Sequence, residues 1–99
     1  MDLLSIISSL ENHGFNRNVE HIKSFAGFTE KDTVVWSKDD GSGFTLTVDE
    51  DTIDFDSVWK CCLIESLESV WYFVVLELVN GKVVHKLFDV EDLSAISYS

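Results

Sequence analysis

The segment VWYFVVLELVNGKVVHKLF, residues 70–88, constrains the fold of this chain more than any other. The Asn80-Gly81 pair between two alternating runs predicts an antiparallel hairpin with a two-residue turn. The apolar side chains of its first strand divide between two faces: Trp71, Phe73 and Val75 on one, and Val70, Tyr72, Val74, Leu76 and Leu78 on the other. A strand that is apolar on both faces must be covered on both. The rest of the chain therefore has to supply two covering layers.

Two N-terminal helices are predicted to cover one face of the sheet. Asp2 is a suitable N-cap for the first helix, and Gly14 is a suitable left-handed residue at its end. Asn18 would cap a second, short helix that ends at Gly27. The expected inward side chains are Leu3, Leu4, Ile6, Ile7 and Leu10 in the first helix, and Val19, Ile22, Phe25 and Ala26 in the second. The other face would be covered by curling of the sheet, by a second copy of the chain or by a partner protein.

From Thr33 onward the apolar period changes from that of a helix to that of a strand. The expected strands are 33–37, 44–48, 52–64, 70–79 and 83–88. The first two flank the loop KDDGSG and predict a hairpin, while a short helix over 57–65 is the alternative to the third. Residues 89–97 are expected to form a capped turn or short helix. The predicted fold is one α+β domain over 1–99: two helices packed on a five-stranded antiparallel meander, with a partial barrel left open.

The charge of the chain is strongly acidic and unevenly distributed. The net charge is −11, of which residues 39–99 carry −10. This balance argues against direct binding to nucleic acid or to an anionic membrane, because both need Lys and Arg to meet phosphates. It favours a basic protein partner, which long-range attraction would steer towards the chain. Solubility alone is the simpler explanation of the same charge.

No motif for catalysis, metal binding or a cofactor is present, so the chain is predicted not to be an enzyme. The adjacent Cys61 and Cys62 form no C-x-x-C pair, and we expect Cys61 in the core and Cys62 half-exposed. Asp54 and Asp56 share a strand face, but exposed carboxylates would both stay ionised and make a poor acid–base pair. A calcium loop fails as well, since Gly41 occupies a ligand position.

The chain is expected to be cytoplasmic. Its N-terminus lacks the positive segment of a signal peptide. Its longest apolar run, residues 70–76, is far shorter than the roughly 20 residues that span a bilayer. Two adjacent cysteines also make a poor disulfide framework.

The most acidic part of the chain lies between residues 39 and 56. The candidate partner-binding residues are Asp39, Asp40, Asp49, Glu50, Asp51, Asp54 and Asp56, with Trp36 and Trp59 as aromatic anchors. If 44–48 pairs with 53–59, the loop 49–51 lies at one end of the sheet and Asp39–Asp40 at the other. Such a stripe could occupy a groove built for a phosphate backbone.

In composition the chain resembles small acidic inhibitors of phages and bacteria: nucleic-acid mimics, anti-defence proteins and immunity proteins for nuclease toxins. The resemblance implies a non-catalytic protein that inhibits a basic partner, such as a nucleic-acid-binding protein or nuclease, by covering its surface. The alternative is an assembly module that forms homodimers through strand 70–79. Both a monomer and a homodimer are compatible with the sequence.

Overall fold

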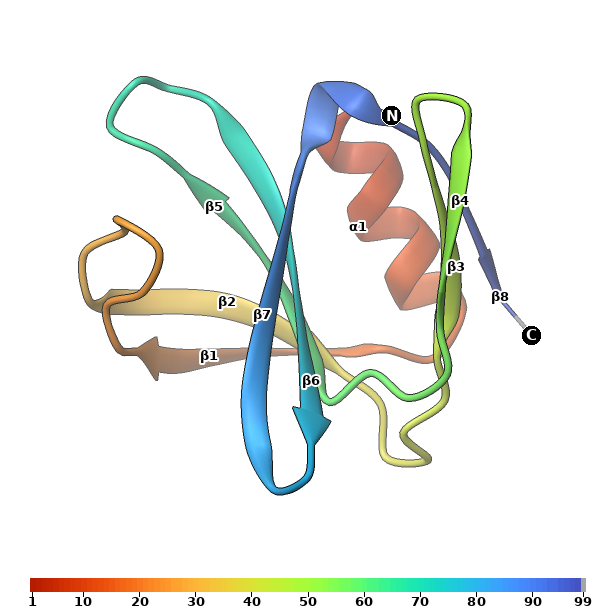
Figure 1. Ribbon diagram of the computed structural model, residues 1–99, viewed down its shortest axis with the longest axis horizontal. Helices are drawn as coiled ribbons and strands as arrows, with labels where there is room; N and C mark the ends of the chain where they lie inside the picture. Colours follow the sequence, from red (N-terminus) through yellow and green to blue (C-terminus); the bar gives the residue numbers. More distant parts are fainter. Residues whose placement is uncertain (99) are drawn as a thin grey trace.

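The computed structural model describes residues 1–98 and has an α+β fold, with one α-helix and eight strands in two antiparallel sheets (Figure 1). The elements are α1 (Leu3–Asn12), β1 (Asn16–Ile22), β2 (Lys31–Ser37), β3 (Phe44–Val48), β4 (Asp51–Phe55), β5 (Lys60–Glu65), β6 (Trp71–Val79), β7 (Lys82–Asp89), the 3-10 helix η1 (Val90–Asp92) and β8 (Leu93–Tyr98). The larger sheet has the order β1-β2-β5-β6-β7, and the smaller has the order β4-β3-β8.

Helix α1 begins and ends where the sequence predicts. The Asp2 carboxylate accepts a hydrogen bond of 2.8 Å from the Ser5 N–H, as an N-cap does. Gly14 has a φ of +91°, and the Phe15 N–H donates to the Leu10 carbonyl at 3.0 Å. The Gly14 N–H also donates to the Glu11 carbonyl at 3.3 Å, and the two bonds form a Schellman ending that directs Phe15 into the core.

The predicted second helix is wrong, because residues 16–22 form strand β1. This strand pairs with β2 along its whole length, from Asn16↔Ser37 to Ile22↔Lys31. The hairpin ends in the segment 23–30, called here the β1–β2 tip. Within it Ala26 and Gly27 both have positive φ, and two backbone bonds join Phe25 to Phe28. Pairing with β2 gives the seven residues of β1 backbone hydrogen-bond partners, whereas a single short helix has only marginal stability on its own.

The predicted hairpin of 33–37 and 44–48 is also wrong, because β2 and β3 belong to different sheets. Residues 38–43 instead cross from one sheet to the other. Gly43 makes this crossing possible, since a Cβ at this position would lie 1.5 Å from the Phe55 carbonyl oxygen. In place of a five-stranded meander, β2 pairs directly with β5, and the β3–β4 hairpin that lies between them in sequence belongs to the second sheet.

The long strand predicted for 52–64 is two strands, β4 and β5, in separate sheets. Residues 56–59 connect them and interrupt the alternation of buried and exposed side chains: Val58 is buried, like Phe55 and Cys61, while Trp59 is 40% exposed. The alternative helix over 57–65 is wrong too, since β5 occupies most of that range. Residues 44–48 do pair with the segment that follows them, but the partner is 51–55 rather than 53–59, from Phe44↔Phe55 to Val48↔Asp51.

The C-terminal third confirms one hairpin and adds a strand. β6 pairs with β7 around Asn80 and Gly81, which both have the positive φ of the expected turn. Asp89 caps η1 by accepting from the Glu91 N–H at 2.9 Å, as a capped turn requires. The chain then continues into β8, which the sequence did not predict and which pairs with β3.

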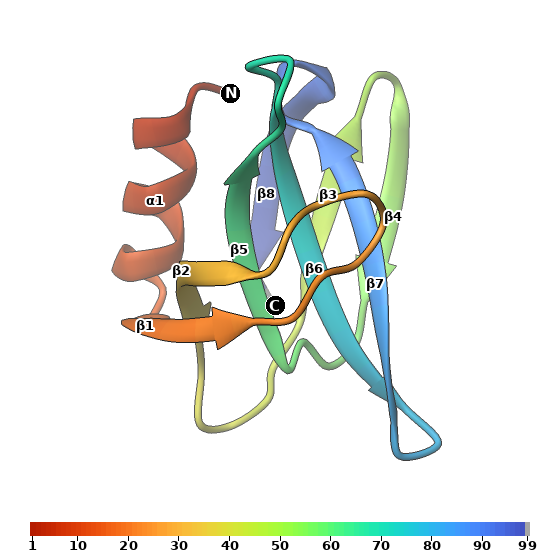
Figure 2. The same ribbon diagram turned by 90° about the vertical axis from the view of Figure 1, so that its left-hand side faces the viewer.

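The two faces of the larger sheet bury two separate clusters. The inner cluster lies between this sheet, α1 and the smaller sheet, and its buried members include Ile6, Leu10, Phe44, Leu46, Phe73 and Val75. The outer cluster consists of Val35, Cys62, Ile64, Val74 and Leu76. Figure 2 shows the β1–β2 tip folded across this outer face, where Phe25 and Phe28 pack against the cluster.

The chain's own tip therefore covers the middle of the second face of strand 70–79, around Val74 and Leu76. Among residues 1–98 the sheets close into no barrel, although the larger sheet turns sharply between β2 and β5 (Figure 1). Cys62 is fully buried in the outer cluster, so the expected half-exposed thiol is wrong. Burial raises the pKa of Cys62 to about 12.

Candidate partner-binding surface

The seven predicted acidic residues are all exposed, but they do not form one surface. Asp39, Asp40 and Asp56 lie where residues 38–43 pass the end of β4. Asp49, Glu50 and Asp51 lie at the opposite end of the β3–β4 hairpin, at the top of Figure 1. Asp54 lies between the two groups and accepts a hydrogen bond of 2.7 Å from the Thr45 hydroxyl. The separation expected from the strand pairing is thus present.

The turn at 49–51 contacts a second acidic turn, at 91–92, that is far from it in sequence. The Asp49 N–H donates to the Asp92 carbonyl at 2.9 Å, next to the pairing of β3 with β8. This bond adds two carboxylates to the surface. We name the combined surface the acidic end: Asp49, Glu50, Asp51, Glu91 and Asp92.

The acidic end lacks ion pairs, in contrast to other charged parts of the chain. Within residues 1–98, no member of the acidic end lies within 4.0 Å of a Lys, Arg or His nitrogen or of the N-terminal amine. The bases contact other acids: the ion pairs include Arg17–Glu11, Lys38–Asp40, Lys60–Glu20 and Lys86–Glu77. The negative charge of the acidic end is therefore left facing solvent.

Trp36, predicted as an exposed anchor, is buried and only 3% exposed. Its indole N–H donates to a Glu11 carboxylate oxygen at 2.9 Å, and the Arg17 Nε–H donates to the same oxygen at 2.8 Å. Hydrogen bonds from Arg17 and then from Trp36 lower the pKa of Glu11. This arrangement fastens α1 to the first hairpin, so the prediction of Trp36 as an anchor is wrong.

Trp59 is exposed, as an anchor would have to be, but it lies away from the acidic end. It lies in the connection between β4 and β5, and its backbone N–H donates to the Leu76 carbonyl at 3.0 Å. The Lys60 ammonium lies 4.5 Å from its ring centroid, a cation–π contact.

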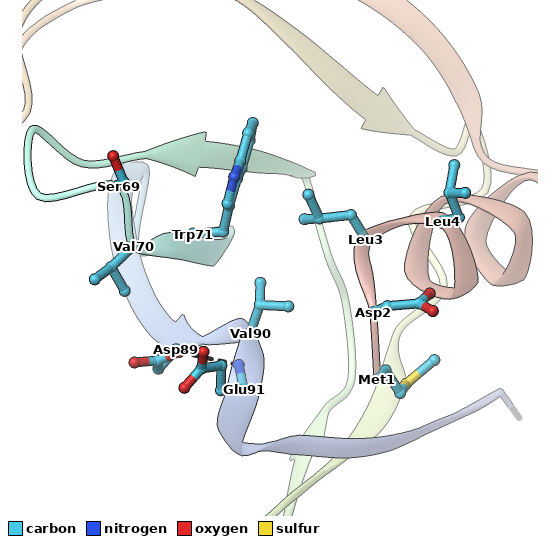
Figure 3. A pocket seen from close by; sticks show the side chains of 10 residues that line it. All are labelled: Met1, Asp2, Leu3, Leu4, Ser69, Val70, Trp71, Asp89, Val90 and Glu91. Carbon is cyan, nitrogen blue, oxygen red and sulfur yellow. Dashed lines mark hydrogen bonds between the residues drawn. The ribbon is translucent and has the colours of Figure 1, made fainter.

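A groove opens beside the acidic end, between the start of α1, the start of β6 and η1 (Figure 3). Its volume is about 580 Å³, within the range typical of ligand pockets. Leu3, Trp71 and Val90 point into it from three different elements, as Figure 3 shows. Three carboxylates also line it: Asp2, Asp89 and Glu91. Glu91 thus belongs both to the groove and to the acidic end.

The carboxylates of the groove differ in whether they accept hydrogen bonds from other groups of the chain. Asp2 caps α1, and the Ser5 N–H lowers its pKa. Asp89 accepts from the Glu91 N–H and so holds η1. The Glu91 side chain forms no hydrogen bond or ion pair within residues 1–98, which leaves it available to a ligand cation.

Other polar groups do not assemble into a reactive site. Among the described residues, no three His, Cys, Asp or Glu side chains are grouped so that they could hold a metal ion. His85 lies on β7 and is separated by β6 from the two cysteines on β5. Its ring stacks on Phe25 with centroids 4.3 Å apart, so it helps to hold the β1–β2 tip.

Comparison of the chain with protein-family models, with curated proteins and with solved structures gives no match. Over residues 1–98, no helix is both long and apolar enough to cross a membrane.

Proposed function

We propose that this chain is a non-catalytic binding protein that inhibits a partner by covering a basic, nucleic-acid-binding surface. The observation that supports the proposal most directly is the Asp49–Asp92 hydrogen bond, which joins two acidic turns into one surface of five carboxylates. The proposed setting is the cytoplasm, and the proposed partner is a nuclease or another protein that binds phosphates.

The charge of the acidic end suits this role physically. Its carboxylates are exposed, so a partner's Lys and Arg could pair with them without first breaking internal ion pairs. A fixed negative surface attracts such a partner over about 10 Å at moderate salt and raises its rate of association. Carboxylates on two turns also offer the spaced negative charges that a phosphate-binding groove accepts.

A second function, assembly through homodimers, is favoured by the far end of the β6–β7 hairpin. Four apolar side chains are exposed there: Leu78, Val79, Val83 and Val84. The sequence predicts a dimer contact along the whole of strand 70–79, but Tyr72, Val74 and Leu76 pack in or against the outer cluster. A dimer would therefore use the hairpin end, and Leu78→Asp should disrupt it. Light scattering across a wide dilution range measures the mass directly, and a mass of one chain at all concentrations would exclude this function.

Two matched charge reversals test the inhibitor proposal. Glu50→Lys with Asp51→Lys changes the acidic end, whereas Asp39→Lys with Asp56→Lys changes the opposite end. Each pair raises the net charge from −11 to −7, because each substitution adds two charges. Both variants should fold like the wild type by circular dichroism, since all four side chains are exposed.

The immobilised proteins are used to capture partners from a lysate of the cells that make the chain, at low and high salt. The captured protein is then tested for nucleic-acid binding in the presence of each variant. We expect the wild type and the Asp39/Asp56 variant to displace nucleic acid from it, and the Glu50/Asp51 variant to fail. Equal displacement by both variants would contradict the proposal.

A further inference from the structure

We infer that the groove between α1, β6 and η1 receives a large apolar side chain from a basic segment of the partner. This inference rests on the proposed function and adds where the partner is anchored and by what chemistry. Charge alone would make the partner associate fast but with little specificity. An apolar side chain of the partner, bound in the groove beside the charges, would fix the position of its basic segment on this chain.

The interior of the groove is suited to an apolar side chain. Leu3, Trp71 and Val90 face one another across it, and Trp71 remains 36% exposed without any occupant. Leu4 stands at the rim and is 76% exposed. An occupant that covered the exposed parts of Trp71 and Leu4 would remove apolar surface from water, which favours binding.

The charge around the groove selects a basic occupant. Asp2, Asp89 and Glu91 line it, and no Lys, Arg or His side chain within residues 1–98 does. Met1 also lines the groove, and its N-terminal ammonium, which donates to the Leu93 carbonyl, is a single positive charge against the three carboxylates. A Lys or Arg on either side of an inserted apolar residue would therefore meet Glu91 and the rest of the acidic end. A second copy of this chain, with a net charge of −11, is repelled by the same surface.

A random-peptide library displayed on phage tests the inference without a known partner. The library is selected on the immobilised full chain at low salt, and enriched peptides are synthesised with a fluorescent label. Their affinities are measured by anisotropy against the wild type, Trp71→Ala and Trp59→Ala. Trp59 is the matched control, because it is similarly exposed at 40% but lies outside the groove.

We expect enriched peptides to combine a large apolar residue with neighbouring Lys or Arg. Trp71→Ala should weaken their binding about tenfold or more, as loss of a central aromatic contact does, while Trp59→Ala should leave it unchanged. Leu4→Lys, at an exposed helical position, is a second variant that should weaken binding by placing a cation at the rim. Circular dichroism confirms that each variant is folded.

The outcomes separate this inference from the proposed function. Absence of enrichment, selection of acidic peptides, or equal binding to Trp71→Ala would overturn the groove assignment. If Glu50→Lys with Asp51→Lys removes displacement of nucleic acid but Trp71→Ala does not alter peptide binding, the groove assignment fails and the proposed function stands. If Trp71→Ala weakens peptide binding while the charge reversal leaves displacement intact, the proposed function fails and the groove remains a docking site.

Discussion

The two faces of the larger sheet are covered in different ways, and the neighbouring residues Cys61 and Cys62 each face one of them. Among residues 1–98, the inner cluster has fourteen buried residues and is enclosed by α1 and a second sheet. The outer cluster has five and is covered by a loop that contributes two phenylalanines. We therefore expect the two faces to differ in local stability. The β1–β2 tip should be able to open from the outer cluster without global unfolding of the chain.

The attachment of the β1–β2 tip supports this view. Phe25 stacks on His85, and Phe28 contacts Tyr72 edge to face with centroids 5.7 Å apart. The backbone hydrogen bonds within the tip join Phe25 and Phe28 to each other. Side-chain contacts thus carry the attachment, and these can break one at a time.

The largest expected effect is in the inner cluster. Phe73→Ala removes a fully buried ring that packs near Phe44. We expect it to lower the free energy of unfolding by about 3–5 kcal/mol, a large share of the stability of a small domain. Urea denaturation followed by circular dichroism measures the change. A loss below about 1 kcal/mol would mean that the inner cluster is not the main source of stability.

Removal of the tip's rings should have a smaller and more local effect. Phe25→Ala should cost less than Phe73→Ala, because Phe25 is only partly buried. Its main consequence should be faster alkylation of Cys62, measured in a variant that keeps only this cysteine. The matched control keeps only Cys61, whose rate should change much less because it faces the inner cluster. Equal acceleration of both thiols would show that the two clusters open together.

The same labelling in the otherwise unchanged chain sharpens the comparison further. The sequence predicts faster labelling of Cys62 on the ground that its thiol is half-exposed, and that reason is wrong, since both thiols are buried. Burial raises the pKa of both, so neither should react without opening. We still expect Cys62 to react faster, through local opening of the tip. Identical slow rates would indicate that labelling requires global unfolding.

The sequence correctly predicted the features of the fold that are determined by a few consecutive residues. The Asp2 cap, the ending of α1 at Gly14 and the Asn80-Gly81 turn each depend on a few adjacent residues. The alternation of strand 70–79 also correctly predicted that both its faces need cover. What covers the outer face was not predictable, since Phe25 and Phe28 have a spacing that suits a helix as well as a turn.

The acidic end shows the same limit for the candidate site. Asp49 and Asp92 are far apart in sequence and meet because β8 pairs with β3. The register of this pairing shifts between Thr47 and Val48, where Leu93 and Ala95 are the partners. The shift breaks the period of two in LSAISY, so the alternation that would have predicted a strand is interrupted.

A modest stabilisation is expected from Ala26→Gly at the turn of the tip. Ala26 has a φ of +46°, a left-handed conformation that costs a residue with a Cβ roughly 1 kcal/mol. Glycine relieves this cost but gains freedom in the unfolded chain, so the net gain should be below about 1 kcal/mol. Slower labelling of Cys62 with unchanged labelling of Cys61 would locate the gain in the tip. Faster labelling of Cys62 would contradict the expectation.

The smallest effect concerns pH at the base of the tip, where His21 on β1 lies between two acids. Its ring nitrogens lie 3.1 Å from Asp32 and 3.5 Å from Glu30. The hydrogen bond to Asp32 is the main cause of a raised pKa; partial desolvation opposes it and Glu30 adds to it. A histidine whose pKa is raised on folding stabilises the fold below its unfolded value of 6.5, and the contribution is lost as pH rises through the folded value.

The melting temperature of His21→Gln should therefore fall below that of the wild type at about pH 5.5 and match it more closely at about pH 8. The difference should be small, because the three side chains are exposed and solvent screens their attraction. Asp32→Asn is the matched control, since it removes the main partner and should greatly reduce the pH dependence contributed by His21. A melting difference that is equal at both pH values, or larger at the higher one, would show that protonated His21 does not hold the tip.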